Sequence, residues 1–339
     1  MNHEIDISMF NIRTDLAIEE IDLNDKNISC YQKNNIKITN IIINDKNKDK
    51  YLKKEGNYIT IEFDDITDFN NSKEIELVLI DELKKILNKL NIKENDTCLV
   101  IGLGNEKSTP DSLGPLSIND IIVTNHFYEL NIDVQEGFRS VAAISPGVMG
   151  QTGIETFDII NSITKEIKPD FIIVIDSLKA SSVDRINKTI QITDSGISPG
   201  SGIGNNRKEI SYDVLKIPVI AVGIPTVVDT ITIVNDSINY MTNYYSYMKD
   251  NIDNPSEKLK IVRTNFNQND INYNDKKELF GLIGSLNDDE LKKYISEVLN
   301  PLGYNMIVTT KDIDFTIKRL SEVLSISINN VLHKNVTNI

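Results

Sequence analysis

The chain has 339 residues, of which 40% are hydrophobic and 25% charged, as in an ordinary globular protein. Its net charge of -14 argues against binding nucleic acid through phosphates, and no apolar run reaches the roughly 18 residues of a membrane span. The N-terminus lacks the regions of a signal peptide, and two cysteines make no disulfide framework. We therefore expect a cytoplasmic protein that binds neither nucleic acid nor membranes.

The first quarter of the chain is predicted to form strands followed by a helix. Residues 36–43 and 58–63 alternate apolar and polar side chains, the period of strands with one buried face, which predicts a paired ribbon. Asn71 and Glu74 have the spacing of a capping box, and apolar residues recur after them at helical spacing as far as Leu90. A helix is therefore expected to open at Asn71.

The central region alternates short apolar runs with helical segments. A helix is expected over Gln151–Ile167, opened by a capping box between Thr152 and Glu155. Runs that are apolar throughout are typical of strands buried on both faces of a parallel sheet. The runs cover residues 97–101, 171–175 and 217–222.

This pattern predicts an α/β fold: a mostly parallel twisted sheet with helices on both faces, an added N-terminal strand ribbon and C-terminal helices. Beyond about Asp250 the chain is more polar, and helices are expected near residues 276–299 and 311–332. They form either a helical appendage or the last layer of the same domain.

Two aspartates follow the ends of the predicted strands. The glycine turn after the first run leads to Asp111, and Asp176 comes directly after the second run. Functional groups gather beyond the carboxyl ends of strands in such sheets, so both side chains are expected to face one crevice. Two facing carboxylates suit peptide hydrolysis, because one can take a proton from water while the other donates one. Each aspartate could instead be a helix cap or a turn residue.

Other chemistries fit the sequence less well. Lys107 occupies the third glycine position of a dinucleotide fingerprint that would begin at Gly102, and no P-loop lysine motif occurs. Ser198 has the letters of a nucleophile elbow, but Pro199 has no N–H to offer an oxyanion. Histidine scarcity weakens serine-triad and zinc-site hypotheses, whereas a carboxylate metal site on the two aspartates remains open. The histidines are His3, His126 and His333.

The same stretches resemble the germination protease family of spore-forming bacteria. The block from Ala143 to Thr156, which includes Ile-Ser-Pro-Gly-Val-Met-Gly, is the most specific part of the resemblance. The other matching segments are Ile12–Ala17, Gly102–Asn105, Thr109–Pro115, Lys168–Phe171, Gly200–Asn205 and Gly223–Asp229.

The resemblance implies an endopeptidase that starts the degradation of small acid-soluble spore proteins during germination. It implies the fold of hydrogenase-maturation peptidases, a homotetramer, a location in the forespore or spore core, and catalysis by Asp111 and Asp176. No cofactor or metal ligand is predicted. Residues of the site loops that are expected to bind substrate are Gly102, Gly104, Asn105, Gly147, Gly150 and Ser177.

The resemblance also implies a zymogen that cuts itself between Asp15 and Leu16, so that residues 1–15 are a propeptide. Residues 16–339 would form a single α/β catalytic domain, with a core at about 91–250 and a helical part at about 251–339. The order of residues 14–19 itself resembles a substrate, although Ile18 stands where a small polar residue is expected. Alternatively, Asp15 caps a helix that starts at Leu16.

Two alternatives remain beside the aspartate-dependent endopeptidase. One is a metal-dependent hydrolase or maturation-type peptidase on the same fold, which sensitivity to chelators would reveal. The other is a non-enzymatic protein whose glycine loops bind a peptide or nucleotide. That protein would keep its function after both aspartates were changed to asparagine.

Overall fold

The computed structural model describes residues 14–20, 27–51, 53–200, 208–253, 271–299, 306–334 and 336. Within these ranges, contacts between Cα atoms divide the chain into two compact units. The larger unit holds the described residues of 14–180, 184–227 and 309–336, and the smaller unit holds those of 181–183 and 228–308. No helix in the described ranges is long and apolar enough to cross a membrane.

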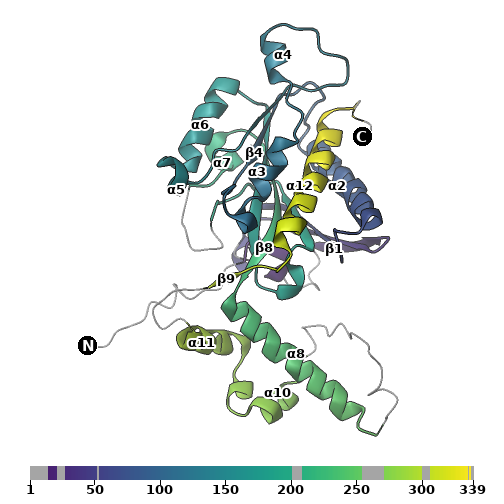
Figure 1. Ribbon diagram of the computed structural model, residues 1–339, viewed down its shortest axis with the longest axis vertical. Coiled ribbons are helices and arrows are strands. Elements are labelled where there is room, and N and C mark those ends of the chain that lie inside the picture. Colours follow the sequence, from purple (N-terminus) through teal and green to yellow (C-terminus); the bar gives the residue numbers. More distant parts are fainter. Residues whose placement is uncertain are drawn as a thin grey trace, which may run out of the picture. The chain divides into compact units, whose positions relative to one another are not determined.

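The described strands form one sheet, which Figure 1 shows with its covering helices. Their bounds are β1 Ile28–Lys33, β2 Ile36–Ile43, β3 Gly56–Glu62, β4 Cys98–Gly102, β5 Val141–Ile144, β6 Phe171–Ala180, β7 Thr189–Thr193, β8 Val219–Asp229 and β9 Ile307–Val308. Their order in the sheet is β1-β2-β3-β7-β8-β6-β4-β5, and β9 pairs with β8.

The sheet combines an antiparallel and a parallel half. Neighbours from β1 through β2, β3 and β7 to β8 are antiparallel, whereas β6, β4 and β5 are parallel. The Ile172 N–H at the start of β6 donates to the Pro218 carbonyl just before β8, at 2.9 Å, so these two neighbours begin at the same edge. The expected α/β class is confirmed, and the predicted ribbon of β2 and β3 is part of the main sheet.

The helices of the larger unit lie along both faces of this sheet. Their bounds are α1 Lys48–Tyr51, α2 Phe69–Lys89, α3 Leu113–Asn119, α4 Asn125–Glu129, α5 Met149–Thr152, α6 Thr156–Ile167, α7 Tyr212–Leu215 and α12 Ile313–Leu332. Short 3-10 helices are η2 Ala17–Glu19, η3 Thr109–Asp111 and η4 Val183–Arg185, of which Val183 belongs to the smaller unit.

Alternate residues of the central strands build two cores. Val100 of β4 and Ile173 of β6 belong to the core that contains α2 and α12, which lie side by side in Figure 1. Leu99 and Ile172, one position earlier in each strand, belong to the core that contains α6. Because successive side chains of a strand point to opposite faces, runs that are apolar throughout mark strands covered on both sides.

Two predicted helix starts are wrong. Helix α2 begins at Phe69, and its cap is Asp68, whose carboxylate accepts the Asn71 N–H at 3.0 Å. Asn71 therefore supplies the backbone N–H that is capped. It is not the capping residue, although its spacing to Glu74 matches that of a capping box. The segment predicted as one helix over 151–167 is divided into α5 and α6, because Gly153 adopts a left-handed conformation with φ of 72°.

The smaller unit is built on α8, Thr230–Asp250, with α10 Tyr273–Phe280, η6 Ile283–Ser285 and α11 Asp288–Leu299. The side chain of Asp229 caps α8 by accepting the Thr232 N–H at 2.7 Å. Helices α10 and α11 occupy the segment near 276–299, which was predicted as one helix. By contrast, α12 packs against α2 in the larger unit, so the last predicted helix is a layer of the main fold.

Candidate active site

The turn after β4 forms the floor of the candidate site. The Leu103 N–H donates to the Ile175 carbonyl of β6 at 2.8 Å, so pairing between the strands continues one step beyond Gly102. The chain then turns at Gly104, whose φ of +116° favours glycine. Gly102 is also required, because a Cβ atom there would lie 2.3 Å from the Gly114 carbonyl oxygen of α3. These glycines let the following loop return against the strand end.

Asp111 lies directly over this turn. A Cβ atom on Gly104 would be 2.0 Å from the Asp111 carbonyl oxygen and 3.1 Å from its carboxylate oxygen Oδ1. The Asn105 N–H donates to the same carbonyl at 2.9 Å, and Thr226 of β8 donates its hydroxyl to the Pro110 carbonyl at 2.6 Å. Asp111 is half-buried, and its loop is held by a backbone hydrogen bond from Asn105 and by the side-chain hydroxyl of Thr226.

Asp176 reaches the same turn from β6. It follows Ile175, whose carbonyl accepts the Leu103 N–H, and the residue is 8% exposed. Its carboxylate oxygen Oδ1 accepts the Ser177 N–H at 2.9 Å. The structure thus brings Asp111 and Asp176 to one edge of the sheet, as the sequence predicted for residues far apart in the chain.

The expected end of this strand is wrong. Strand β6 continues through Ala180, and Asp176 lies within it. Pairing with β4 ends at Ile175, the last residue of the apolar run, and beyond it the Lys179 carbonyl of β6 accepts the Asp15 N–H. Beside the aspartate, the Ser177 hydroxyl oxygen is buried without a hydrogen-bond partner among the described residues.

A second loop borders the turn through Gln151, which sequence reasoning did not single out. The Gln151 amide donates to Asn105 Oδ1, while its carbonyl oxygen accepts the Val148 N–H at 3.4 Å. Gly147, with φ of +71°, begins this loop, and Gly150 has open space around its Cα atom. Gln151 connects the predicted loop residues to the aspartate turn, and its place within the Ile-Ser-Pro-Gly-Val-Met-Gly-Gln block was the available signal.

The residues around the predicted cleavage position are packed against β6 and β7. Asp15 exchanges hydrogen bonds with Lys179: its N–H donates to the Lys179 carbonyl at 3.1 Å, and its carboxylate accepts the Lys179 N–H at 2.9 Å. Lys179 lies three residues beyond Asp176, or about 10 Å along an extended strand. Leu16 and Ala17 are fully buried. Met1 to Arg13, the rest of the predicted propeptide, lie outside the described residues.

The remaining candidates do not join this site. His126 is exposed on α4 and stacks near Phe127, whereas His333 is buried and contacts backbone groups at the end of α12. Most of the 200–205 glycine segment and His3 lie outside the described ranges. In those ranges, no cluster of three or more His, Cys, Asp or Glu side chains could hold a metal ion.

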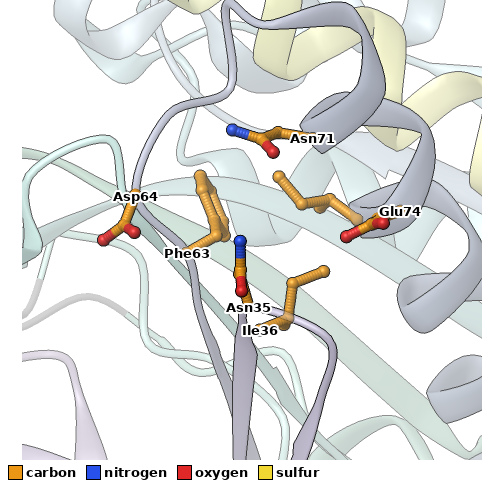
Figure 2. A pocket seen from close by; sticks show the side chains of 7 residues that line it. Asn35, Ile36, Phe63, Asp64, Asn71 and Glu74 are labelled. Carbon is orange, nitrogen blue, oxygen red and sulfur yellow. The ribbon is translucent and has the colours of Figure 1, made fainter.

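A small pocket lies away from the aspartates, at the start of α2 (Figure 2). Its polar rim includes Asp64 and Glu74, and its apolar side is formed by Ile36, Phe63 and Ile75. None of the predicted site residues lines it. The apolar members belong to the core beneath α2, so the pocket marks the margin of that core.

Fold and site together define an α/β protein that holds two carboxylates where the turn after β4 meets β6, an arrangement suited to acid–base hydrolysis. Comparison with known families gives a closer assignment. Residues 8–338 match the model of the germination protease family. The chain belongs to this family and is a peptidase.

Relatives in the family match over almost the whole chain. The germination protease of Priestia megaterium is 41% identical, covering 99% of this chain and 97% of its own. That of Bacillus subtilis strain 168 is 40% identical, covering 98% and 96%. Among solved structures, a [NiFe] hydrogenase maturation protease HycI from Thermococcus kodakarensis is 14% identical with a TM-score of 0.28, covering 42% of this chain and 80% of its own.

Proposed function

We propose that the chain is the zymogen of an endopeptidase that degrades small acid-soluble spore proteins in the spore core, with Asp111 and Asp176 as its catalytic pair. The observation that carries this proposal is that both aspartates border the Gly104 turn, one over the glycine and the other beside Leu103. Because the chain belongs to a family of peptidases, an enzyme is favoured over a non-enzymatic binding protein.

The chemistry follows from two carboxylates in different protonation states. The ionised carboxylate takes a proton from water, and the oxygen of that water attacks the peptide carbonyl carbon. The protonated carboxylate donates its proton to the carbonyl oxygen. When the C–N bond breaks, the proton taken from water passes to the leaving amine, and a hydroxyl of the tetrahedral intermediate returns a proton to the second carboxylate. In this proposal the Ser177 hydroxyl, which has no hydrogen-bond partner among the described residues, and backbone N–H groups of the glycine loops bind the substrate backbone. Hydrolysis yields one new carboxylate and one new amine.

Self-processing is the part of the proposal that intact mass can test. Purified full-length chain is incubated at mildly acidic pH beside Asp111→Asn and Asp176→Asn variants. The wild type should lose residues 1–15, and both variants should stay whole, because an amide can neither take nor donate the required proton at this pH. Asp133→Asn, a change at an exposed aspartate, is the matched control and should be cut like the wild type.

Two outcomes would redirect the proposal. Cutting of both aspartate variants would make Asp111 and Asp176 structural residues. Loss of cutting in the presence of a chelator, with recovery on adding a divalent metal, would favour the metal-dependent peptidase. Digestion of a purified small acid-soluble spore protein tests the substrate, and the mass of the native protein in solution tests the expected tetramer.

A further inference from the structure

Thr14, just before the proposed cleavage position, connects two groups that belong to the chain after it. The Leu16 N–H donates to the Thr14 hydroxyl oxygen at 3.0 Å, and the Thr14 hydroxyl donates to the Glu19 carboxylate oxygen Oε2. Thr14 is 6% exposed and Leu16 is fully buried. The Thr14 hydroxyl therefore bridges the backbone nitrogen of Leu16 and the carboxylate of Glu19, and this bridge is largely shielded from water.

The hydrogen bonds of this segment fall into two groups: those made by residues before the Asp15–Leu16 bond, which leave with the propeptide, and those made by residues after it, which stay with the processed chain. On the leaving side, Lys53 donates to the Thr14 carbonyl at 2.8 Å, and Gln191 Nε2 donates to the Asp15 carbonyl at 3.1 Å. On the retained side, the Ala17 N–H donates to Gln191 Oε1 at 2.7 Å. Residues 16–18 are all buried. Cutting would release the first group of contacts and leave the second in place.

Hydrolysis changes the charge at this buried position. Water adds a hydroxyl to the Asp15 carbonyl carbon and a proton to the Leu16 nitrogen, which becomes an α-ammonium near neutral pH. Thr14, the present hydrogen-bond partner of that nitrogen, departs with the propeptide. A buried ammonium without a partner is costly, and a carboxylate at hydrogen-bond distance is the partner that best offsets the cost.

We propose that Glu19 receives the new N-terminus: after cleavage, the Leu16 ammonium forms an ion pair with the Glu19 carboxylate and fixes the processed end of the chain. The inference rests on the proposed cleavage between Asp15 and Leu16. Arg185 is near Glu19, at 3.6 Å, but lies closer to Glu62, at 2.8 Å. The Leu16 ammonium would add a positive charge beside these two carboxylates.

The Leu16 ammonium can be tested by its reactivity. Full-length wild type and Glu19→Gln are allowed to process, then treated near pH 7 with acetic anhydride, and acetylation of the N-terminal peptide is followed by mass. An ion pair that raises the amine pKa by one unit lowers the free amine tenfold. We therefore expect the wild-type terminus to react about tenfold more slowly than that of Glu19→Gln.

Glu20→Gln is the matched control. Glu20 is the adjacent carboxylate, and it faces Lys53 at 3.5 Å, so its removal should leave the acetylation rate of Leu16 as in the wild type. Glu19→Asp keeps a carboxylate and should restore part of the protection. Glu19→Ala, which also removes the carboxylate, replaces Glu19→Gln if that variant, judged by the melting temperature of its uncut form, does not fold.

Intact mass separates the two hypotheses. A Leu16 terminus that reacts equally fast in wild type and Glu19→Gln would overturn the role of Glu19 and leave self-processing standing. A wild-type chain that keeps residues 1–15 would overturn both. Slow reaction in the wild type, fast reaction in Glu19→Gln and partial recovery in Glu19→Asp would support the ion pair.

Discussion

At the scale of single residues, backbone contacts determine where Asp111 lies. Its carbonyl oxygen accepts the Asn105 N–H, and its own N–H donates to Ser108 at 2.8 Å. The carboxylate can approach the strand end because Gly104 has no side chain. Asp176, in contrast, is fixed by its place in a paired strand. The two aspartates are therefore held by different means, and only one depends on a glycine.

Gly104→Ala should impair the site while Gly150→Ala should not. The added methyl group at residue 104 would meet the Asp111 carbonyl at 2.0 Å in a backbone conformation with φ of +116°. A shift of about 1 Å in a catalytic group can lower a rate about 100-fold, so self-cleavage should slow by that order. At Gly150 nothing lies within 4 Å, and the rate should stay near that of the wild type. Equal rates for the two variants would contradict this assignment.

At the scale of secondary-structure elements, the spacing of apolar residues along the sequence predicted some helices and missed others. Helix α2 has a continuous apolar face against the core, so its existence could be predicted. Helix α8 buries mostly polar side chains, with Ile231 the apolar exception among its buried residues. Its apolar residues Ile231, Val234 and Ile238 recur at helical spacing and pack against α11, but they are fewer than the polar residues that the helix buries, so the apolar pattern is weak.

The start of α2 allows a direct test of the corrected cap. Asp68→Ala removes the acceptor for the Asn71 N–H and should lower the free energy of unfolding by about 1 kcal/mol. Asn71→Ala keeps that N–H and should change it by less than about 0.5 kcal/mol. Urea unfolding followed by circular dichroism measures both. A larger loss for Asn71→Ala would restore the cap expected from the sequence.

At the scale of the whole molecule, the C-terminal end is connected to the central sheet through His333. The Arg139 N–H donates to His333 Nδ1 at 3.2 Å, so Nε2 carries the proton and donates to the Ile122 carbonyl at 3.2 Å. The Lys334 N–H donates to the Gly137 carbonyl at 2.8 Å. These bonds join the end of α12 to the chain that leads into β5, where the neutral imidazole is both acceptor and donor.

This contact predicts a fall in stability with acid. Burial lowers the pKa of His333 below its ordinary value of 6.5, and the nearby Arg139 lowers it further. Below pH 6.5 the unfolded chain therefore binds more protons than the folded chain, so this contribution is complete above pH 6.5 and is lost as pH falls. His333→Gln should flatten the change of melting temperature between pH 7 and 5. His126→Gln, at an exposed ring, should leave it unchanged.

The amino-acid sequence by itself determined the α/β class, the central strands and the aspartates at one sheet edge. Strands covered on both faces need continuous apolar runs, and the carboxyl ends of parallel strands meet at one edge, so local patterns and strand order are sufficient. The short motifs around the glycine turns were also sufficient to indicate the family, because their residue order is specific to it.

Only the tertiary structure decided which distant residues complete the arrangement. Gln151 donates a hydrogen bond to Asn105, and Asp15 exchanges hydrogen bonds with Lys179. The Thr14 hydroxyl bridges the Leu16 N–H and the Glu19 carboxylate. Strand β6 continues past its apolar run, and its Lys179 carbonyl accepts the Asp15 N–H there. These contacts depend on the packing of segments far apart in the chain, which no periodicity within a single segment records.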